Sequence, residues 1–189
     1  MNGFIGEFLG TMILIVLGVG TGAGINLKTS YARNAGWLFV TLAWGMAVTF
    51  GVYVAGSFGA QGHLNPAVTI GFALFGFFPW SQVLPYLLGQ FLGAFVGAVL
   101  VIIQYGAQFK NAKNTSDGNV VGIFATGPAI DNGLYNFLSE NNRNFCIHLY
   151  IIKSWRLYKR IETINCWFIN HGSWSSFGWN NRFRFESSS

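Results

Sequence analysis

Charged residues are scarce in this chain. Only 9% of its 189 residues are Asp, Glu, Lys or Arg, whereas a soluble domain carries about 25%. The two cysteines, Cys146 and Cys166, are too few for a disulfide framework and lack metal-ligand spacing. An ordinary soluble domain and a disulfide-rich scaffold are therefore excluded. The chain is instead 52% hydrophobic and contains 25 glycines. Gly89, Gly93 and Gly97 recur every four residues, a spacing that predicts close approach of a neighbouring membrane helix.

Three apolar runs are long enough to cross a bilayer. They cover about residues 4–24, 37–58 and 82–105, and each is close to the roughly 20 residues that a spanning helix needs. The first run carries one charge, Glu7, and the other two carry none. It lacks a basic start and is too long for a cleaved signal peptide, so we expect it to be a true span. The sequence therefore predicts an all-α, multi-pass membrane protein.

A shorter apolar run lies between the second and third spans. It covers residues 64–78, which is too short to cross the bilayer. Asn65 is a favoured helix N-cap and Pro66 a favoured first helical residue, so a half-helix over about 65–78 is predicted, with its positive dipole end at Asn65. The irregular backbone before it, residues 59–64, can persist at membrane depth only if it is buried in protein or lines water. The pattern predicts a pore-lining loop that runs into a re-entrant half-helix.

Three segments of the chain resemble the aquaporin and glycerol-facilitator family: GEFLGT (6–11), WGMAVTFGVYVAG (44–56) and GHLNPAVTIGFALFG (62–76). The resemblance runs from about residue 3 to 140 and is strongest to bacterial glycerol uptake facilitators. It implies a right-handed bundle of six spanning helices and two half-helices, in two inverted repeats whose Asn-Pro-Ala motifs meet at the bilayer midplane. Residues 1–140 would hold the first repeat and the start of a fourth helix. The family assembles as a homotetramer in the cell membrane, with one pore per subunit.

The resemblance also implies roles for single residues. Asn65 would point its side-chain NH2 into the pore as a donor, after a ladder of backbone carbonyl acceptors in a loop held by His63. Glu7 would brace this loop as a buried acceptor. Trp44 would form the aromatic wall of the outer constriction, where its broad face suits the carbon backbone of a polyol. The pore residues implied in this way are Trp44, Gly62, His63, Leu64, Asn65, Pro66 and Ala67.

The function that the resemblance implies is passive diffusion of glycerol and related small uncharged solutes, and also of water. Donors and acceptors would replace the hydration of the solute, while the positive half-helix ends repel cations. A water-selective aquaporin and a secondary transporter are the alternatives, although Glu7 lies too near the start of its span to suit an ion-coupling carboxylate. No enzyme activity is expected, because Glu7 and His63 are the only acidic or histidine residues in the spans and the loop. We expect no cofactor, metal site or nucleic-acid partner, and the lipid bilayer as the surroundings.

The basic residues of the first 140 positions conflict with this orientation. The family places its N-terminus in the cytoplasm, so its loops after the first and third spans lie outside the cell. The positive-inside rule favours the cytoplasm for the same loops. The residues concerned are Lys28, Arg33, Lys110 and Lys113.

Residues 141–189 depart from the family pattern. They hold seven basic and two acidic residues, contain no Ala, Val or Pro, and lack a second Asn-Pro-Ala motif. One extra nucleotide near Glu140 would explain this, because Trp179 to Ser189, read one nucleotide later, can encode GTTGFALNPAR. We expect an out-of-frame tail without a native fold, disordered or ill-packed, in a truncated chain that does not itself conduct.

Overall fold

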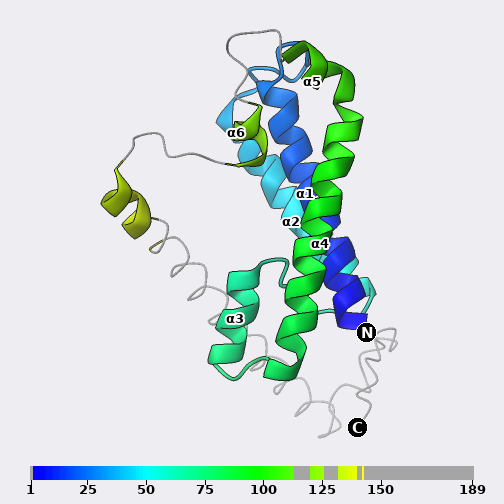
Figure 1. Cartoon of the computed structure of the whole chain (residues 1–189), viewed down its shortest axis with the longest axis vertical. Coiled ribbons are helices and arrows are strands. Elements are labelled where there is room, and N and C mark those ends of the chain that lie inside the picture. Colours follow the sequence, from blue (N-terminus) through cyan, green and yellow to red (C-terminus); the bar gives the residue numbers. More distant parts are fainter. Residues whose placement is uncertain (1, 113–119, 126–131, 140–141, 143–189) are drawn as a thin grey trace, which may run out of the picture. The chain divides into compact units, whose positions relative to one another are not determined.

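The computed structural model describes residues 2–112, 120–125, 132–139 and 142. Its labelled helices (Figure 1) are α1 (Asn2–Asn26), α2 (Gly36–Ser57), α3 (Pro66–Leu74), α4 (Trp80–Gln104), α5 (Gly106–Ala112) and α6 (Val121–Phe124). Helices α1, α2 and α4 are long and apolar enough to cross a membrane, and each begins and ends close to its predicted span. The all-α membrane fold with three spanning helices and one half-helix is confirmed.

The chain divides into two compact units, Met1–Asp131 and Asn132–Ser189. All six labelled helices belong to the first unit. In the second unit, residues 133–139 are helical, in the stretch where the fourth span was expected to begin. The predicted out-of-frame tail lies outside the described residues, apart from residue 142.

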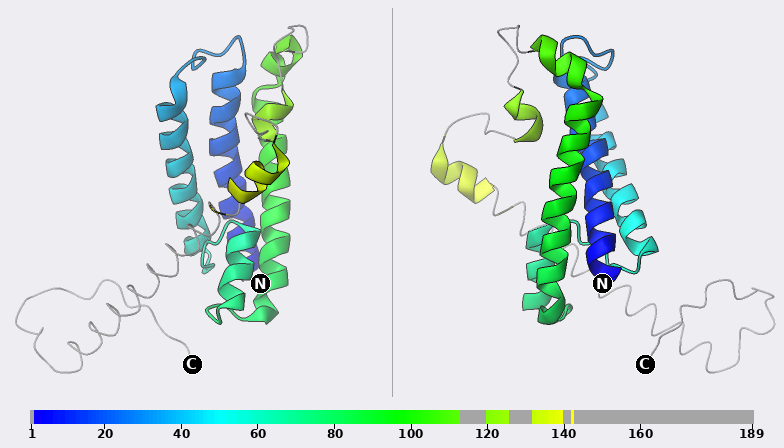
Figure 2. Two further views of the ribbon diagram at one scale, coloured as in Figure 1. Left: turned by 90° about the vertical axis from the view of Figure 1, so that its left-hand side faces the viewer. Right: turned by 45° about the vertical axis from the view of Figure 1, so that its right-hand side comes forward.

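Helix α1 is the centre of the first unit. Helices α2 and α4 both pack along it, and the short α3 packs against α4 (Figure 2). The contact of α1 with α4 is backbone against backbone. A Cβ added at Gly89 would lie 2.6 Å from the carbonyl oxygen of Phe4, and one added at Gly97 would lie 2.9 Å from that of Met12. The predicted close approach at these glycines is therefore present, and α1 is the neighbour that it admits.

Helix α3 ends at Leu74, four residues before the predicted end of the half-helix. Gly76 adopts a left-handed conformation, with φ of +74°. Its N–H donates to the carbonyl of Ala73, and the N–H of Phe77 donates to that of Phe72, which is the paired bonding of a Schellman cap. Hydropathy gave no sign of this end, because the apolar run continues through the cap.

A second cap of the same kind ends α2. Gly59 has φ of +76°. Its N–H donates to the carbonyl of Gly56, and the N–H of Ala60 donates to the carbonyl of Ala55. The chain then enters the irregular loop before α3. A glycine cap therefore ends each of the two helices that flank this loop, α2 before it and α3 beyond it.

The basic residues that the structure describes in the first unit lie at one end of the bundle. Lys28 and Arg33 lie in the connection from α1 to α2, and Lys110 lies in α5, which follows α4. This is the end opposite α3 (Figure 1). The conflict between the family orientation and the positive-inside rule therefore concerns one whole end of the bundle.

Candidate functional site

The loop before α3 contains an unusual backbone conformation. Gly62 has φ of +69°, which glycine adopts without strain, but Leu64 has φ of +52°. A leucine in the left-handed region costs free energy, so the surrounding structure must hold it there. Its side chain is buried against the core cluster that includes Ala55 and Ala60.

Glu7 provides the hydrogen bonds that hold this backbone. The N–H of His63 donates to Oε1 of Glu7 at 2.7 Å, and the N–H of Leu64 donates to Oε2 at 2.8 Å. Gln90 of α4 donates to the same Oε2 through its side-chain Nε2, also at 2.8 Å. The Glu7 side chain is completely buried, and these three donors replace the water that a carboxylate would otherwise bind. Glu7 thus lies where the resemblance expected a brace.

These bonds also orient the carbonyl groups of the loop. A trans peptide places its C=O opposite its N–H, and the described residues contain no cis peptide bond. Because the amides of His63 and Leu64 point at Glu7, the carbonyls of Gly62 and His63 point away from it. One side of the loop is therefore anchored to α1, and the other side presents acceptors.

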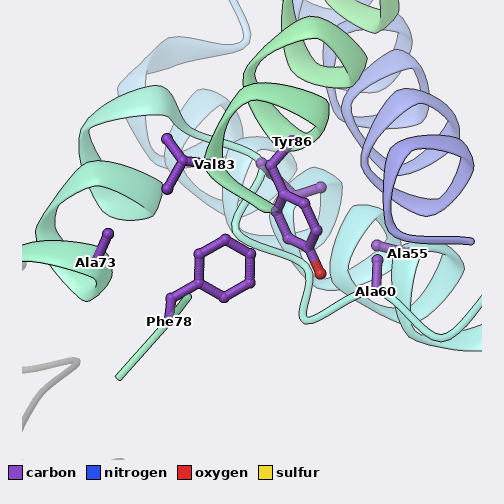
Figure 3. Packing of buried hydrophobic residues seen from close by; sticks show 7 residues of the cluster. Ala55, Ala60, Ala73, Phe78, Val83 and Tyr86 are labelled. Carbon is purple, nitrogen blue, oxygen red and sulfur yellow. The ribbon is translucent and has the colours of Figure 1, made fainter. Parts of the chain in front are cut away.

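The ring of His63 is held among three aromatic side chains. Its centroid lies 5.0 Å from that of Phe72, 4.8 Å from that of Phe78 and 5.1 Å from that of Tyr86. Figure 3 shows the ring of Phe78 between Ala73 and Tyr86, which closes this side of the cluster. The His63 ring therefore extends from the loop into a packed aromatic core, and this packing can fix the loop in position.

Polar contacts complete the support of His63. Its Nδ1 lies 3.1 Å from the hydroxyl of Thr69, and its Nε2 lies 3.2 Å from Oε1 of Gln61. Gln90 donates to Thr69 at 2.9 Å, and the hydroxyl of Tyr86 accepts the backbone N–H of Gln61 at 3.1 Å. The loop is therefore bound from α1, α3 and α4 at once.

Asn65 begins α3 and has its amide group fixed. Its Oδ1 accepts the backbone N–H of Ala67 at 2.9 Å, with Pro66 as the first helical residue, as the sequence predicted. With the oxygen engaged in the cap, the NH2 group is directed away from the helix. The side chain is exposed, and it lies at the positive end of the α3 dipole.

Trp44 lies at a different level of the bundle. It is half-buried and packs against a cluster formed by Val19, Ala23, Leu27, Val101 and Ile123. Its ring lies on Gly18 of α1, whereas Leu64 of the loop lies beside Gly10. Eight residues of helix separate these two glycines, a rise of about 12 Å. The predicted pore residues 62–67 thus lie together, and Trp44 lies two turns further along α1.

Sequence reasoning missed the supporting residues Thr69, Tyr86 and Gln90. Gln90 did carry a signal in the sequence, because it is an amide in the middle of an apolar span. The structure leaves it only 2% exposed. Tyr86 and Thr69 carried none, since each is common in apolar helices. In the part of the chain that the structure describes, no group of three or more His, Cys, Asp or Glu side chains could hold a metal ion.

The structure has three helices that can cross a membrane and one half-helix, and the loop that leads into the half-helix is hydrogen-bonded to a buried carboxylate. These features define a multi-pass membrane protein. Residues 1–131 match the family model described as Major intrinsic protein, and the chain belongs to this family.

Similar proteins support the same assignment. The chain is 69% identical over 145 residues to glycerol uptake facilitator protein 2 of Lactiplantibacillus plantarum, a match that covers 77% of this chain and 62% of that protein. It is 46% identical over 151 residues to the glycerol uptake facilitator protein of Streptococcus pneumoniae, a match that covers 80% of this chain and 63% of that protein. The X-ray structure of the aquaglyceroporin from Plasmodium falciparum is similar with a TM-score of 0.55 at 38% identity, over 59% of this chain and 45% of that one. The chain spans less than two thirds of the length of these relatives.

Proposed function

We propose that this chain forms the first half of a channel for passive diffusion of glycerol and related small uncharged solutes, and of water. The observation that carries the proposal is the binding of two successive loop amides, those of His63 and Leu64, by buried Glu7. This contact turns a row of carbonyl acceptors away from α1, next to a half-helix that begins with an exposed amide donor. The names of the similar bacterial proteins support glycerol as the solute.

The arrangement can replace the hydration of a polyol. The carbonyls of Gly62, His63 and Leu64 accept from the hydroxyl groups, and the NH2 of Asn65 donates to them. The indole of Trp44 provides an apolar surface for the carbon chain. The positive end of α3 disfavours a cation at Asn65, so an uncharged solute is favoured. None of these groups undergoes a chemical reaction, so the proposed activity is transport and not catalysis.

The pore also needs a second half. Asn65–Pro66 is the only Asn-Pro pair in the 189 residues, so the chain supplies one capped half-helix of this type. We propose that a second half-helix faces Asn65 in the conducting protein, and that this protein is a homotetramer. The 189-residue chain then conducts no glycerol. The family match covers residues 1–131, so residues 141–189 lie outside it.

Two proteins test the proposal against the chain as it stands. One is encoded by the gene with a single base removed near codon 141. The other, here called the hybrid channel, joins residues 1–131 of this chain to the remainder of the L. plantarum protein. We expect glycerol uptake into vesicles from both, and none from the 189-residue chain.

Each other outcome has a clear meaning. A hybrid channel that inserts and assembles but passes only water would favour a water-selective pore. Uptake that requires an ion gradient would favour a transporter. Uptake by the 189-residue chain itself would contradict the need for a second half.

A further inference from the structure

The contact between Trp44 and Gly18 is too close for any side chain at position 18. A Cβ added there would lie 2.6 Å from Cζ3, 2.7 Å from Cε3 and 2.8 Å from Cη2 of the Trp44 indole. Gly18 is itself buried, so the six-membered ring of Trp44 lies directly on the backbone of α1. Three glycines further along the same helix, Gly20, Gly22 and Gly24, differ in this respect. A Cβ at Gly20 would lie 4.0 Å from its nearest neighbour, a methyl group of Val101, which is ordinary contact.

The size of the overlap determines what a methyl group at Gly18 would do. Carbon atoms in contact prefer separations of about 3.5–4.0 Å, so the indole would have to recede by roughly 1 Å. An indole is rigid, and three of its ring atoms are involved, so a bond rotation at one end cannot relieve the contact. Because α1 blocks one face of the half-buried ring, it can recede only toward its open side.

We propose that Gly18 is a specificity-determining residue of the channel, because the missing side chain sets how far Trp44 lies back from the path of the solute. The inference rests on the proposed function, in which Trp44 lines the outer constriction. A pore that selects by diameter responds to a displacement of this size, and it responds most for the largest solute that still passes. Gly18 acts through Trp44, so it is a positioning residue and does not itself contact the solute.

The first test measures solute selectivity in the hybrid channel. Gly18→Ala is expected to lower glycerol permeability about tenfold or more, with a smaller loss for water and complete exclusion of a four-carbon polyol. Gly20→Ala is the matched control, since it makes the same change two residues further along α1 at a position where the added Cβ overlaps no neighbouring atom. It should leave the ratio of glycerol to water permeability unchanged.

A double variant separates positioning from general damage to α1. Phenylalanine lacks the outer ring atoms that meet position 18. Gly18→Ala combined with Trp44→Phe should therefore have the selectivity of Trp44→Phe alone. Equal selectivity of Gly18→Ala and Gly20→Ala, or strictly additive effects in the double variant, would overturn the proposal.

The second test uses the 189-residue chain and requires no transport. NMR of the chain in lipid nanodiscs, with the Trp44 signals assigned through Trp44→Phe, should show nuclear Overhauser contacts from its Hζ3 and Hε3 protons to the α protons of Gly18. Absence of these contacts overturns the inference. If they are present and the unsubstituted hybrid channel inserts but passes no glycerol, the proposed function fails while the positioning of Trp44 by Gly18 stands.

Discussion

Gly10 of α1 and Gly51 of α2 meet so closely that neither position has room for a side chain. A Cβ on Gly10 would lie 2.6 Å from the carbonyl oxygen of Gly51, and a Cβ on Gly51 would lie 2.8 Å from that of Gly10. The methyl groups of Leu64 lie in the same notch, 2.8 Å from each added Cβ. The contact that joins two spanning helices therefore also seats the residue with the strained backbone in the loop.

Gly51→Ala should destabilise the bundle by about 1–3 kcal/mol, because the two backbones must separate and Leu64 must move. Thermal unfolding in detergent, followed by helical circular dichroism, measures this loss. Gly45→Ala is the control in the same helix, since no atom lies within 4 Å of an added Cβ there. That variant should be neutral or more stable by up to about 1 kcal/mol. Equal unfolding temperatures for the two variants would contradict the packing described here.

Glu7→Gln should loosen the loop without unfolding the spanning helices. The new side chain has one acceptor oxygen and one NH2 group, so one of the two loop amides would face a donor. A hydrogen bond to a charged group contributes about 1.5–3 kcal/mol, so exchange of the His63 or Leu64 amide should accelerate by roughly 10- to 150-fold. Hydrogen exchange followed by NMR measures this, with the amide of buried Val101 as an unaffected reference. Unchanged protection of both loop amides would show that Glu7 does not hold them.

Asn65→Asp and Asn65→Ala should separate capping from permeation. Aspartate caps a helix about as well as asparagine, whereas alanine costs about 1 kcal/mol. Aspartate, however, replaces the exposed NH2 with an acceptor. In the hybrid channel, Asn65→Asp should therefore keep the stability of the unsubstituted protein and lose glycerol permeability. Retained glycerol flow in Asn65→Asp would remove the donor role from Asn65.

Trp44→Phe should change glycerol permeability of the hybrid channel more than water permeability, because it removes apolar surface that the carbon chain of a polyol would contact. Stopped-flow light scattering of vesicles measures both solutes in one preparation. Equal effects on both would count against a constriction at Trp44.

The start of the half-helix was predictable from local chemistry. Asn65 and Pro66 are adjacent, and their preferences as N-cap and first helical residue do not depend on the rest of the fold. The end at Leu74 depends equally on a local residue, Gly76, but a glycine in this glycine-rich chain is a weak signal. The confirmed spans followed from length and polarity alone, since the bilayer imposes both.

The residues that hold the loop could not be predicted from the sequence in this way. Gln90 lies 83 residues from Glu7, and the two meet only because glycines let α4 approach α1. Nothing in the spacing of the sequence indicates such a pair. The role of Glu7 could be expected only from the family resemblance, and that of Gly18 only from the distance to the Trp44 ring.

The position of Glu7 in the chain has a consequence for biosynthesis. Glu7 is synthesised 56 residues before His63, so the acceptor leaves the ribosome before the loop does. Gly10 is likewise synthesised before Gly51, and the two glycines together form the notch that Leu64 occupies. The α1–α2 hairpin can thus satisfy both loop amides before α4 leaves the ribosome. Gln90 is synthesised last, and it donates the third hydrogen bond to a Glu7 carboxylate that already accepts from the two loop amides.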